Sequence, residues 1–138
     1  MLTSPGGMVY AGLSMYDVIK SYNRIVNTNI YVSGMCMSMG TTILCSVPVE
    51  QRVAHPNTTF MIHQVSSLSF GCIADMEQDI EHSKQLNERL FDILKNNTNI
   101  PESKLEQVYK EKLDWFITAD EAVQYGLISR VSEVPIVY

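Results

Sequence analysis

Short apolar runs alternate with segments of helical periodicity along this chain, and this alternation constrains the fold more than any other feature. The runs at residues 30–32, 52–54, 60–63 and 128–131 are typical of buried strands. Gly34 is expected to close the first of them, because glycine often ends regular structure. Since strands alternate with helices, we predict a single α/β domain over residues 1–138, with mostly parallel strands.

The predicted helices differ in how much of their surface is apolar. A first helix has one apolar face, formed by Ala11, Met15, Val18, Ile19, Tyr22 and Val26. Residues 38–47 are small and apolar and predict a buried helix that Pro48 ends. A long helix over residues 72–95 has one polar face that is exposed or covered by a partner. Residues 102–112 predict a shorter helix, and Thr118 with Glu121 forms a capping box for the last one.

Composition narrows the class of protein. The chain has 138 residues, of which 46% are hydrophobic, so it can bury a core as one domain. Charged residues make up 18%, which is little for a lone monomer, and a buried oligomer face would explain it. The net charge of −5 and the lack of a Lys/Arg cluster disfavour nucleic-acid binding.

The sequence shows no pattern typical of a targeting signal, a membrane span or a metal site. No apolar run approaches the roughly 20 residues that span a bilayer, and no signal peptide stands out. The three cysteines, Cys36, Cys45 and Cys72, argue by their odd number and spacing against a disulfide framework and a zinc site. We therefore expect a cytoplasmic protein without a metal or cofactor, with an organellar or virus-encoded origin left open.

Ser38 is the first candidate for chemistry. It lies between a predicted strand and a predicted helix, where a hydroxyl meets free N–H groups that favour negative charge. On position alone, an ordinary helix cap explains this serine better than a nucleophile does. The G-x-S-x-G turn of α/β-hydrolases is absent from the sequence.

A serine nucleophile needs an imidazole and a carboxylate. His82 lies in a charged stretch and His55 in a turn, so surface and loop roles are expected for them. His63 ends an apolar strand, where α/β folds place ligands and catalysis, although a core histidine is the plainer interpretation. Asp114 precedes the apolar residues 115–117 and is expected to be partly buried and to need a partner.

Four motifs in order make the chain resemble the proteolytic subunit of the Clp protease family over its whole length. They are Ser4-Pro5-Gly6-Gly7 with Ala11-Gly12, then Ser38-Met39-Gly40, then Pro56-Asn57 with Met61-Ile62-His63-Gln64, and last Asp114 with Phe116, Ala119 and Glu121-Ala122-Val123-Gln124-Tyr125-Gly126-Leu127-Ile128. The resemblance implies the Clp/crotonase fold of stacked βαβ units. It also implies a protruding helical handle at about residues 64–95.

The resemblance also implies a role for each matching residue. Ser38 would be the nucleophile of a serine endopeptidase, His63 its general base and Asp114 the carboxylate that orients His63. The backbone N–H groups of Gly7 and Met39 would form the oxyanion hole. Substrate would bind as an added strand along three further residues, Gly6, Met8 and Val65.

The family resemblance implies partners as well. The subunits would form heptameric rings and a tetradecamer with the active sites inside, and an AAA+ unfoldase would feed unfolded proteins into the chamber. ATP-dependent proteolysis to small peptides would follow.

Three departures from the family pattern stand out. The family's N-terminal segment has no counterpart here, so we expect this chain alone to be poorly soluble or inactive. Residues 65–70 replace a Pro- and Gly-rich stretch after His63, next to the substrate. Leu113 stands where the family often has an arginine that couples rings to the active site.

Three other functions are weighed against this one. A non-catalytic subunit of a mixed ring usually lacks a triad residue, whereas Ser38, His63 and Asp114 are all present. A crotonase-type acyl-CoA enzyme on the related fold would need a CoA-binding loop, which is not seen. A dedicated processing protease, as in virus maturation, stays open.

Overall fold

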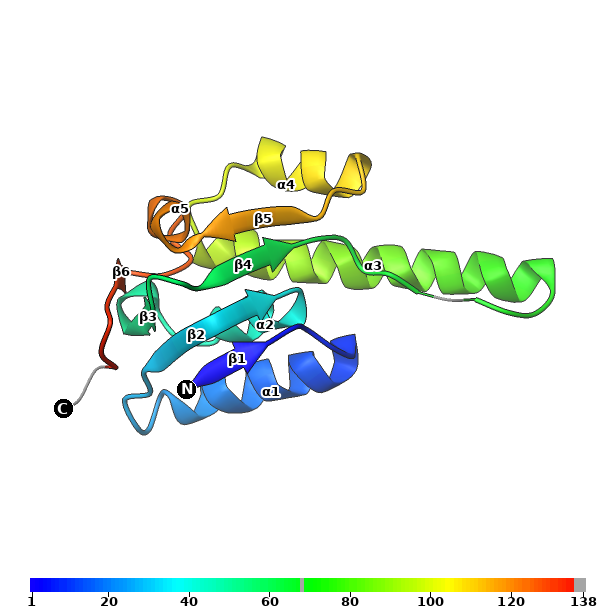
Figure 1. Ribbon diagram of the computed structural model, residues 1–138. Coiled ribbons are helices and arrows are strands. Elements are labelled where there is room, and N and C mark those ends of the chain that lie inside the picture. Colours follow the sequence, from blue (N-terminus) through cyan, green and yellow to red (C-terminus); the bar gives the residue numbers. More distant parts are fainter. Residues whose placement is uncertain (68, 136–138) are drawn as a thin grey trace.

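The computed structural model describes residues 1–67 and 69–135, which form a mixed α/β fold (Figure 1). The strands are β1 (Leu2–Ser4), β2 (Ile30–Met37), β3 (Arg52–Ala54), β4 (Thr59–Ile62), β5 (Trp115–Thr118) and β6 (Arg130–Val131). The helices are α1 (Val9–Tyr22), α2 (Met39–Leu44), α3 (Ile73–Asn97), α4 (Glu102–Lys110) and α5 (Ala119–Gln124), with a 3₁₀ turn at Val49–Gln51.

The sheet is mostly parallel, as the sequence predicts. Its order is β5-β4-β2-β3-β6, with β1 also paired to β2. β2 lies at the centre, since β3 pairs with its first half and β4 with its second half, both parallel to it. β5 is the exception and runs antiparallel to β4. Residues 115–117 are apolar in the sequence, but this strand was not predicted.

β2 is longer than predicted, because Gly34 lies inside it and does not end it. Gly34 has φ +77°, a backbone conformation that suits glycine. At this point the pairing with β1 shifts from Leu2–Val32 to Ser4–Cys36, which inserts extra residues into β2. The bulge lets the strand continue to Met37, directly before Ser38.

α1 packs differently from the prediction. Its buried residues are Gly12 and Tyr16, whereas Met15, Val18 and Tyr22 are exposed and Val26 lies beyond the helix. A Cβ on Gly12 would collide with the Met39 side chain, so glycine lets α1 approach α2 closely. The predicted apolar face of this helix is therefore largely a surface in the isolated chain.

α3 projects beyond the rest of the molecule with its N-terminal half, as expected for the handle (Figure 1). It begins at Ile73 and ends at Asn97, two residues later than predicted. Its C-terminal half reaches the core through Leu86 and Leu94, and residues 73–82 are exposed. The predicted capping box of Thr118 and Glu121 is present at α5.

Two properties concern the described residues alone. None of the helices in residues 1–67 and 69–135 combines the length and apolar character needed to cross a bilayer. In the same part of the chain, no group of three or more His, Cys, Asp or Glu side chains is arranged to hold a metal ion.

Candidate active site

The sheet brings Ser38, His63 and Asp114 to one edge. Ser38 directly follows β2 and His63 directly follows β4, and these strands are parallel neighbours. Asp114 directly precedes β5, whose antiparallel register pairs Trp115 with Ile62 and so leaves Asp114 beside His63. The carboxyl ends of parallel strands are where α/β sheets place reactive groups.

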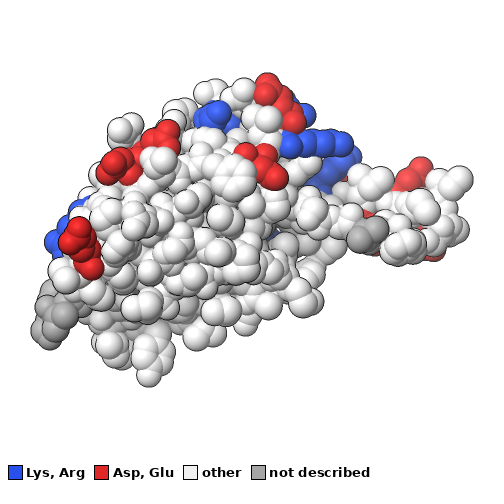
Figure 2. Space-filling view, in the orientation of Figure 1, with Lys and Arg blue, Asp and Glu red and all other residues white. Residues whose placement is uncertain are grey.

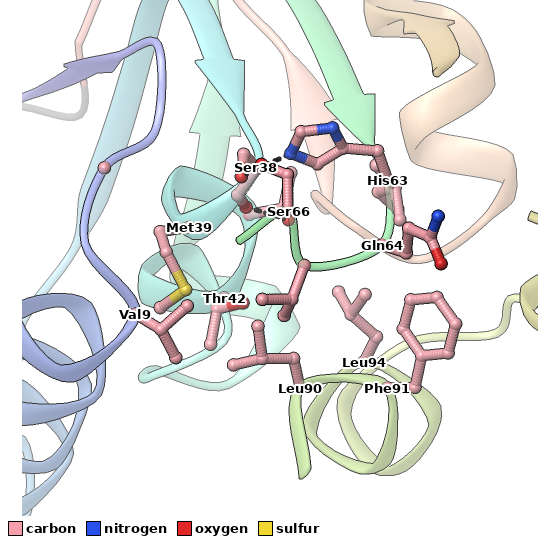
Figure 3. Close-up of a pocket in the computed structure, with 14 residues that line it drawn as sticks. Val9, Ser38, Met39, Thr42, His63, Gln64, Ser66, Leu90, Phe91 and Leu94 are labelled. Atoms are coloured by element: carbon pink, nitrogen blue, oxygen red, sulfur yellow. Dashed lines mark hydrogen bonds between the residues drawn. The ribbon is translucent and has the colours of Figure 1, made fainter. Parts of the chain in front are cut away.

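A hydrogen-bonded series joins the three side chains. His63 Nε2 lies 2.8 Å from Ser38 Oγ (Figure 3). On the other side of the ring, His63 Nδ1 lies 3.2 Å from Asp114 Oδ1. With Nδ1 protonated and bonded to the carboxylate, Nε2 is free to accept the hydroxyl proton of Ser38. The Asp114 side chain is 62% exposed, so the expectation that this carboxylate is partly buried was wrong for the isolated chain.

Ser38 has an unusual backbone conformation, with φ 53° and ψ −120°. Non-glycine residues with positive φ are uncommon and cluster at functional sites. The Ser38 N–H donates to the carbonyl of Met61, and the N–H of Thr41 donates to the carbonyl of Ser38. The side chain makes no capping hydrogen bond, so the alternative of an ordinary helix cap does not describe this serine.

Gly6 packs directly against Ser38. A Cβ on Gly6 would lie 2.7 Å from Ser38 Cβ and 3.2 Å from its Oγ, and Gly6 has φ +104°. The Gly6 N–H donates to Ser4 Oγ at 3.1 Å, which holds the turn that leads out of β1. The glycine in this Pro-Gly-Gly segment therefore allows its backbone to lie close to Ser38.

Gly7 and Met39 both line a small cavity beside Ser38, of about 70 Å³. Met39 is the first residue of α2, so its N–H is among the helix N–H groups without an intrahelical partner. Both residues thus border the same hollow as Ser38. This arrangement suits an oxyanion hole.

The rest of the cavity is lined by both apolar and polar residues (Figure 3). Its walls include side chains from α1, α2, β4 and α3: Val9, Thr42, Ile62, Leu90, Phe91 and Leu94. These wall residues were not predicted as site residues. Leu90 and Leu94 belong to the predicted apolar positions of the long helix, but periodicity cannot distinguish a cavity wall from a core contact.

Three residues were predicted to contact a substrate strand. Gly6 lies beside Ser38, and Met8 is 78% exposed on the same segment. Val65 lies in the segment after His63 and lines the cavity together with Gln64 and Ser66. The Val65 N–H already donates to Asn87 Oδ1 at 2.9 Å.

The other two histidines lie outside the site. His55 is in a turn, where its Nδ1 accepts from the Asn57 N–H. His82 is exposed on α3, as predicted, and its Nε2 is hydrogen-bonded to the hydroxyl of Tyr10.

The cysteines are free, and two of them are buried. Burial raises the pKa of the Cys36 thiol and of the Cys45 thiol, so both stay protonated. Protonated buried thiols are poor nucleophiles, so Ser38 has no rival from these two residues.

Charge is unevenly distributed on the face shown in Figure 2. Charged side chains gather along the upper edge and on the projecting end of α3. The central and lower part of this face, over β1, β2 and α1, shows almost no charged atoms.

Comparisons with known proteins agree with the fold and the motifs. The family model for Clp protease matches residues 1–135. The chain is 37% identical over 130 residues to an ATP-dependent Clp protease proteolytic subunit of Deinococcus radiodurans. It is 36% identical over 130 residues to ATP-dependent Clp protease proteolytic subunit 2 of Chlamydia muridarum and to the same subunit of Chlamydia pneumoniae.

The matched region is nearly the whole chain but only part of each relative. It covers 94% of this chain and 62% of the length of each of these three proteins. Because the family model spans almost every residue, from the Pro-Gly-Gly turn through the last strand, the chain belongs to the Clp protease family.

Proposed function

We propose that this chain is a catalytic subunit of a Clp-type serine endopeptidase. The observation that supports it most is the hydrogen-bonded series from Ser38 Oγ through His63 to Asp114. The relatives' names, which describe proteolytic subunits, point to the same chemistry.

In this mechanism, Ser38 Oγ attacks the scissile carbonyl while His63 Nε2 takes the hydroxyl proton. Asp114 keeps Nδ1–H bonded and stabilises the imidazolium that forms. The negative charge on the carbonyl oxygen is received by the N–H groups of Gly7 and Met39. His63 then protonates the leaving amine, and water, activated by the same imidazole, releases the acyl group from Ser38.

The cavity beside Ser38 suits the substrate side chain next to the cleaved bond. Its size of about 70 Å³ favours a compact side chain, whose apolar part would contact Val9, Leu90 and Leu94. Polar recognition is then left to the substrate backbone, which pairs as an added strand between the segment of Gly6 and Met8 and the segment of Val65. Such recognition is weakly selective for sequence and suits unfolded proteins.

Assembly into rings accounts for apolar surfaces that the isolated chain leaves open. On α1, Met15, Val18 and Tyr22 are each more than half exposed. On and beside the projecting end of α3, Phe70 and Ile73 are exposed by 82% and 77%. Contiguous apolar surface of this kind marks interfaces. Heptameric rings stacked as a tetradecamer, fed by an AAA+ unfoldase, would cover both surfaces and enclose the sites.

A fluorophosphonate probe tests the proposal without an unfoldase, because it needs a serine activated by its imidazole. We expect labelling of Ser38 in the native chain and none in Ser38→Ala. His63→Ala should slow labelling by about 10²–10⁴-fold, the usual contribution of a general base. Ser14→Ala, at an exposed position of α1, is the control and should label at the native rate. Native chain that stays unlabelled would favour a non-catalytic subunit of a mixed ring.

A further inference from the structure

α3 contacts the segment that follows His63 through a series of hydrogen bonds. The Val65 N–H donates to Asn87 Oδ1 at 2.9 Å. The Ser67 and Ser83 hydroxyls lie 3.0 Å apart. The Ser69 hydroxyl donates to Asp79 Oδ2 at 2.6 Å. We call these three contacts the ladder.

The spacing of the ladder follows from the geometry of the two elements. Val65 and Ser67 are two residues apart in the segment, and two residues of an extended chain span about 6.6 Å. The ladder's members on α3 are four residues apart, which advances the helix by about 6 Å. The two repeats nearly match, so successive bonds form on one helix face as the segment and α3 run in opposite directions.

Of the α3 residues in the ladder, Asn87 is the one whose side chain is buried. It is 4% exposed, although it is a polar residue on a helix whose neighbouring turns are largely solvent-facing. It lies three and four residues before Leu90 and Phe91, so all three share one helix face. Leu90 and Phe91 form the cavity wall, and Val65 lies two residues after His63.

The opposite wall of the cavity is also tied to α3. The Tyr10 hydroxyl, near the start of α1, is hydrogen-bonded to His82 Nε2, and the two rings stack with centroids 6.0 Å apart. Tyr10 follows Met8 and Val9, the segment that continues from the glycines beside Ser38. One helix therefore contacts both segments between which a substrate strand would bind.

We propose that α3 holds both sides of the substrate cleft in position. Asn87 is then a positioning residue for the side formed by the segment after His63. The role in substrate binding rests on the proposed function. The hydrogen bond by which Asn87 holds the Val65 N–H does not depend on that function. Because that N–H is bonded to Asn87, it is not available to a substrate. In an extended chain, successive N–H groups point to opposite sides, so Gln64 and Ser66 present their backbone groups to the substrate instead.

The matched variants are Asn87→Leu, which keeps the shape but removes the acceptor, and Asn87→Asp, which keeps an acceptor oxygen. Hydrogen exchange at the Val65 amide reads out the bond directly. We expect exchange about tenfold faster in Asn87→Leu, because a lost hydrogen bond of ordinary strength opens the segment to water. Exchange in Asn87→Asp should stay close to the native rate.

Kinetics then separate positioning from a general loss of structure. For an extended peptide substrate, we expect Asn87→Leu to raise KM by about fivefold or more and to change kcat less, since strand binding is lost and the triad is kept. Labelling by the small fluorophosphonate should fall by a smaller factor than peptide kcat/KM. Gln85→Ala, at an exposed position of α3 two residues away, should match the native protein in every measurement.

The outcomes are distinct. If hydrogen exchange at the Val65 amide is unchanged in Asn87→Leu, the proposal that α3 holds this segment is wrong, whatever the activity. A second outcome is faster exchange in Asn87→Leu together with equal losses of labelling and of kcat. If Asn87→Asp does not restore them, Asn87 has only a structural role and the positioning role is overturned. If the native chain neither labels nor cleaves peptides, the proposed function fails, and the exchange measurement still decides whether Asn87 holds Val65.

Discussion

At the scale of single residues, the site depends on two backbone conformations that are held by their surroundings. Ser38 adopts φ 53° and is fixed by hydrogen bonds to Met61 and Thr41. Gly6 adopts φ +104° where any side chain would meet Ser38. The Ser38 hydroxyl therefore reaches His63 because two neighbouring segments accept strained or glycine-specific geometry.

Substitution Gly6→Ala tests this dependence. The added Cβ would lie 2.7 Å from Ser38 Cβ, closer than real contacts, so Ser38 must shift away from His63. We expect fluorophosphonate labelling to fall at least tenfold and the free energy of unfolding to fall by about 1–3 kcal/mol.

Gly34→Ala is the matched control for that experiment. Gly34 also has positive φ, +77°, but a Cβ there would meet only Thr3 Cγ2, at an ordinary 3.7 Å. The control should lose stability by a similar amount and keep its labelling rate. Equal labelling losses in the two variants would mean that backbone strain, and not the contact with Ser38, explains the effect.

At the scale of elements, Arg52 joins the ends of several helices. It is 1% exposed, yet its hydrogen-bond partners are carbonyl oxygens: Val47 after α2, Asn97 at the end of α3, and Gly126 and Leu127 after α5. Carbonyl ends of helices carry partial negative charge, which favours a cation. Burial lowers the pKa of Arg52, but a guanidinium stays protonated at neutral pH.

Arg52→Leu should therefore destabilise the fold strongly. It leaves the carbonyls of Val47 and Asn97 without their donor, and unsatisfied buried acceptors cost roughly 1–3 kcal/mol each. We expect the free energy of unfolding to fall by about 2–5 kcal/mol in urea titrations. Arg130→Leu, at an exposed position of β6, should change it by no more than about 0.5 kcal/mol, and an equal effect would refute this role of Arg52.

At the scale of the whole molecule, the isolated chain leaves apolar surface on α1 and on the projecting end of α3. Val18 is 62% exposed and Ile80 is 54% exposed, on helices that the core covers only in part. The exposure of Asp114 fits the same picture, since a neighbouring subunit would shield that carboxylate from water. These features support the proposed ring assembly.

Val18→Glu should weaken that assembly. The charge would be buried unpaired in a subunit contact, whereas in the monomer it stays in water. We expect a lower molar mass in sedimentation at the same concentration, with the free energy of unfolding of the monomer nearly unchanged. Asn96→Glu adds the same charge at an exposed position near the end of α3 and serves as the control. Identical masses for both variants would exclude α1 from the interface.

Much of the fold follows from local patterns, and the exceptions have physical causes. The parallel strands, the long helix α3 and the capping box at Thr118 come from periodicity and neighbouring residues. β1 was missed because three residues carry little pattern. The end of β2 was misplaced because Gly34 makes a bulge in this sheet, and glycine serves bulges as well as strand ends.

The sequence by itself determined the α/β class and, through four motifs in order, the family to which the chain belongs. The tertiary structure decided the rest, because the contacts involved link residues far apart in the chain. The antiparallel pairing of β5 brings Asp114 to His63, and the packing of α3 brings Asn87 to Val65. Taken from its own neighbours alone, Ser38 was a helix cap, and its hydrogen bond to His63 depends on the strands that place them together.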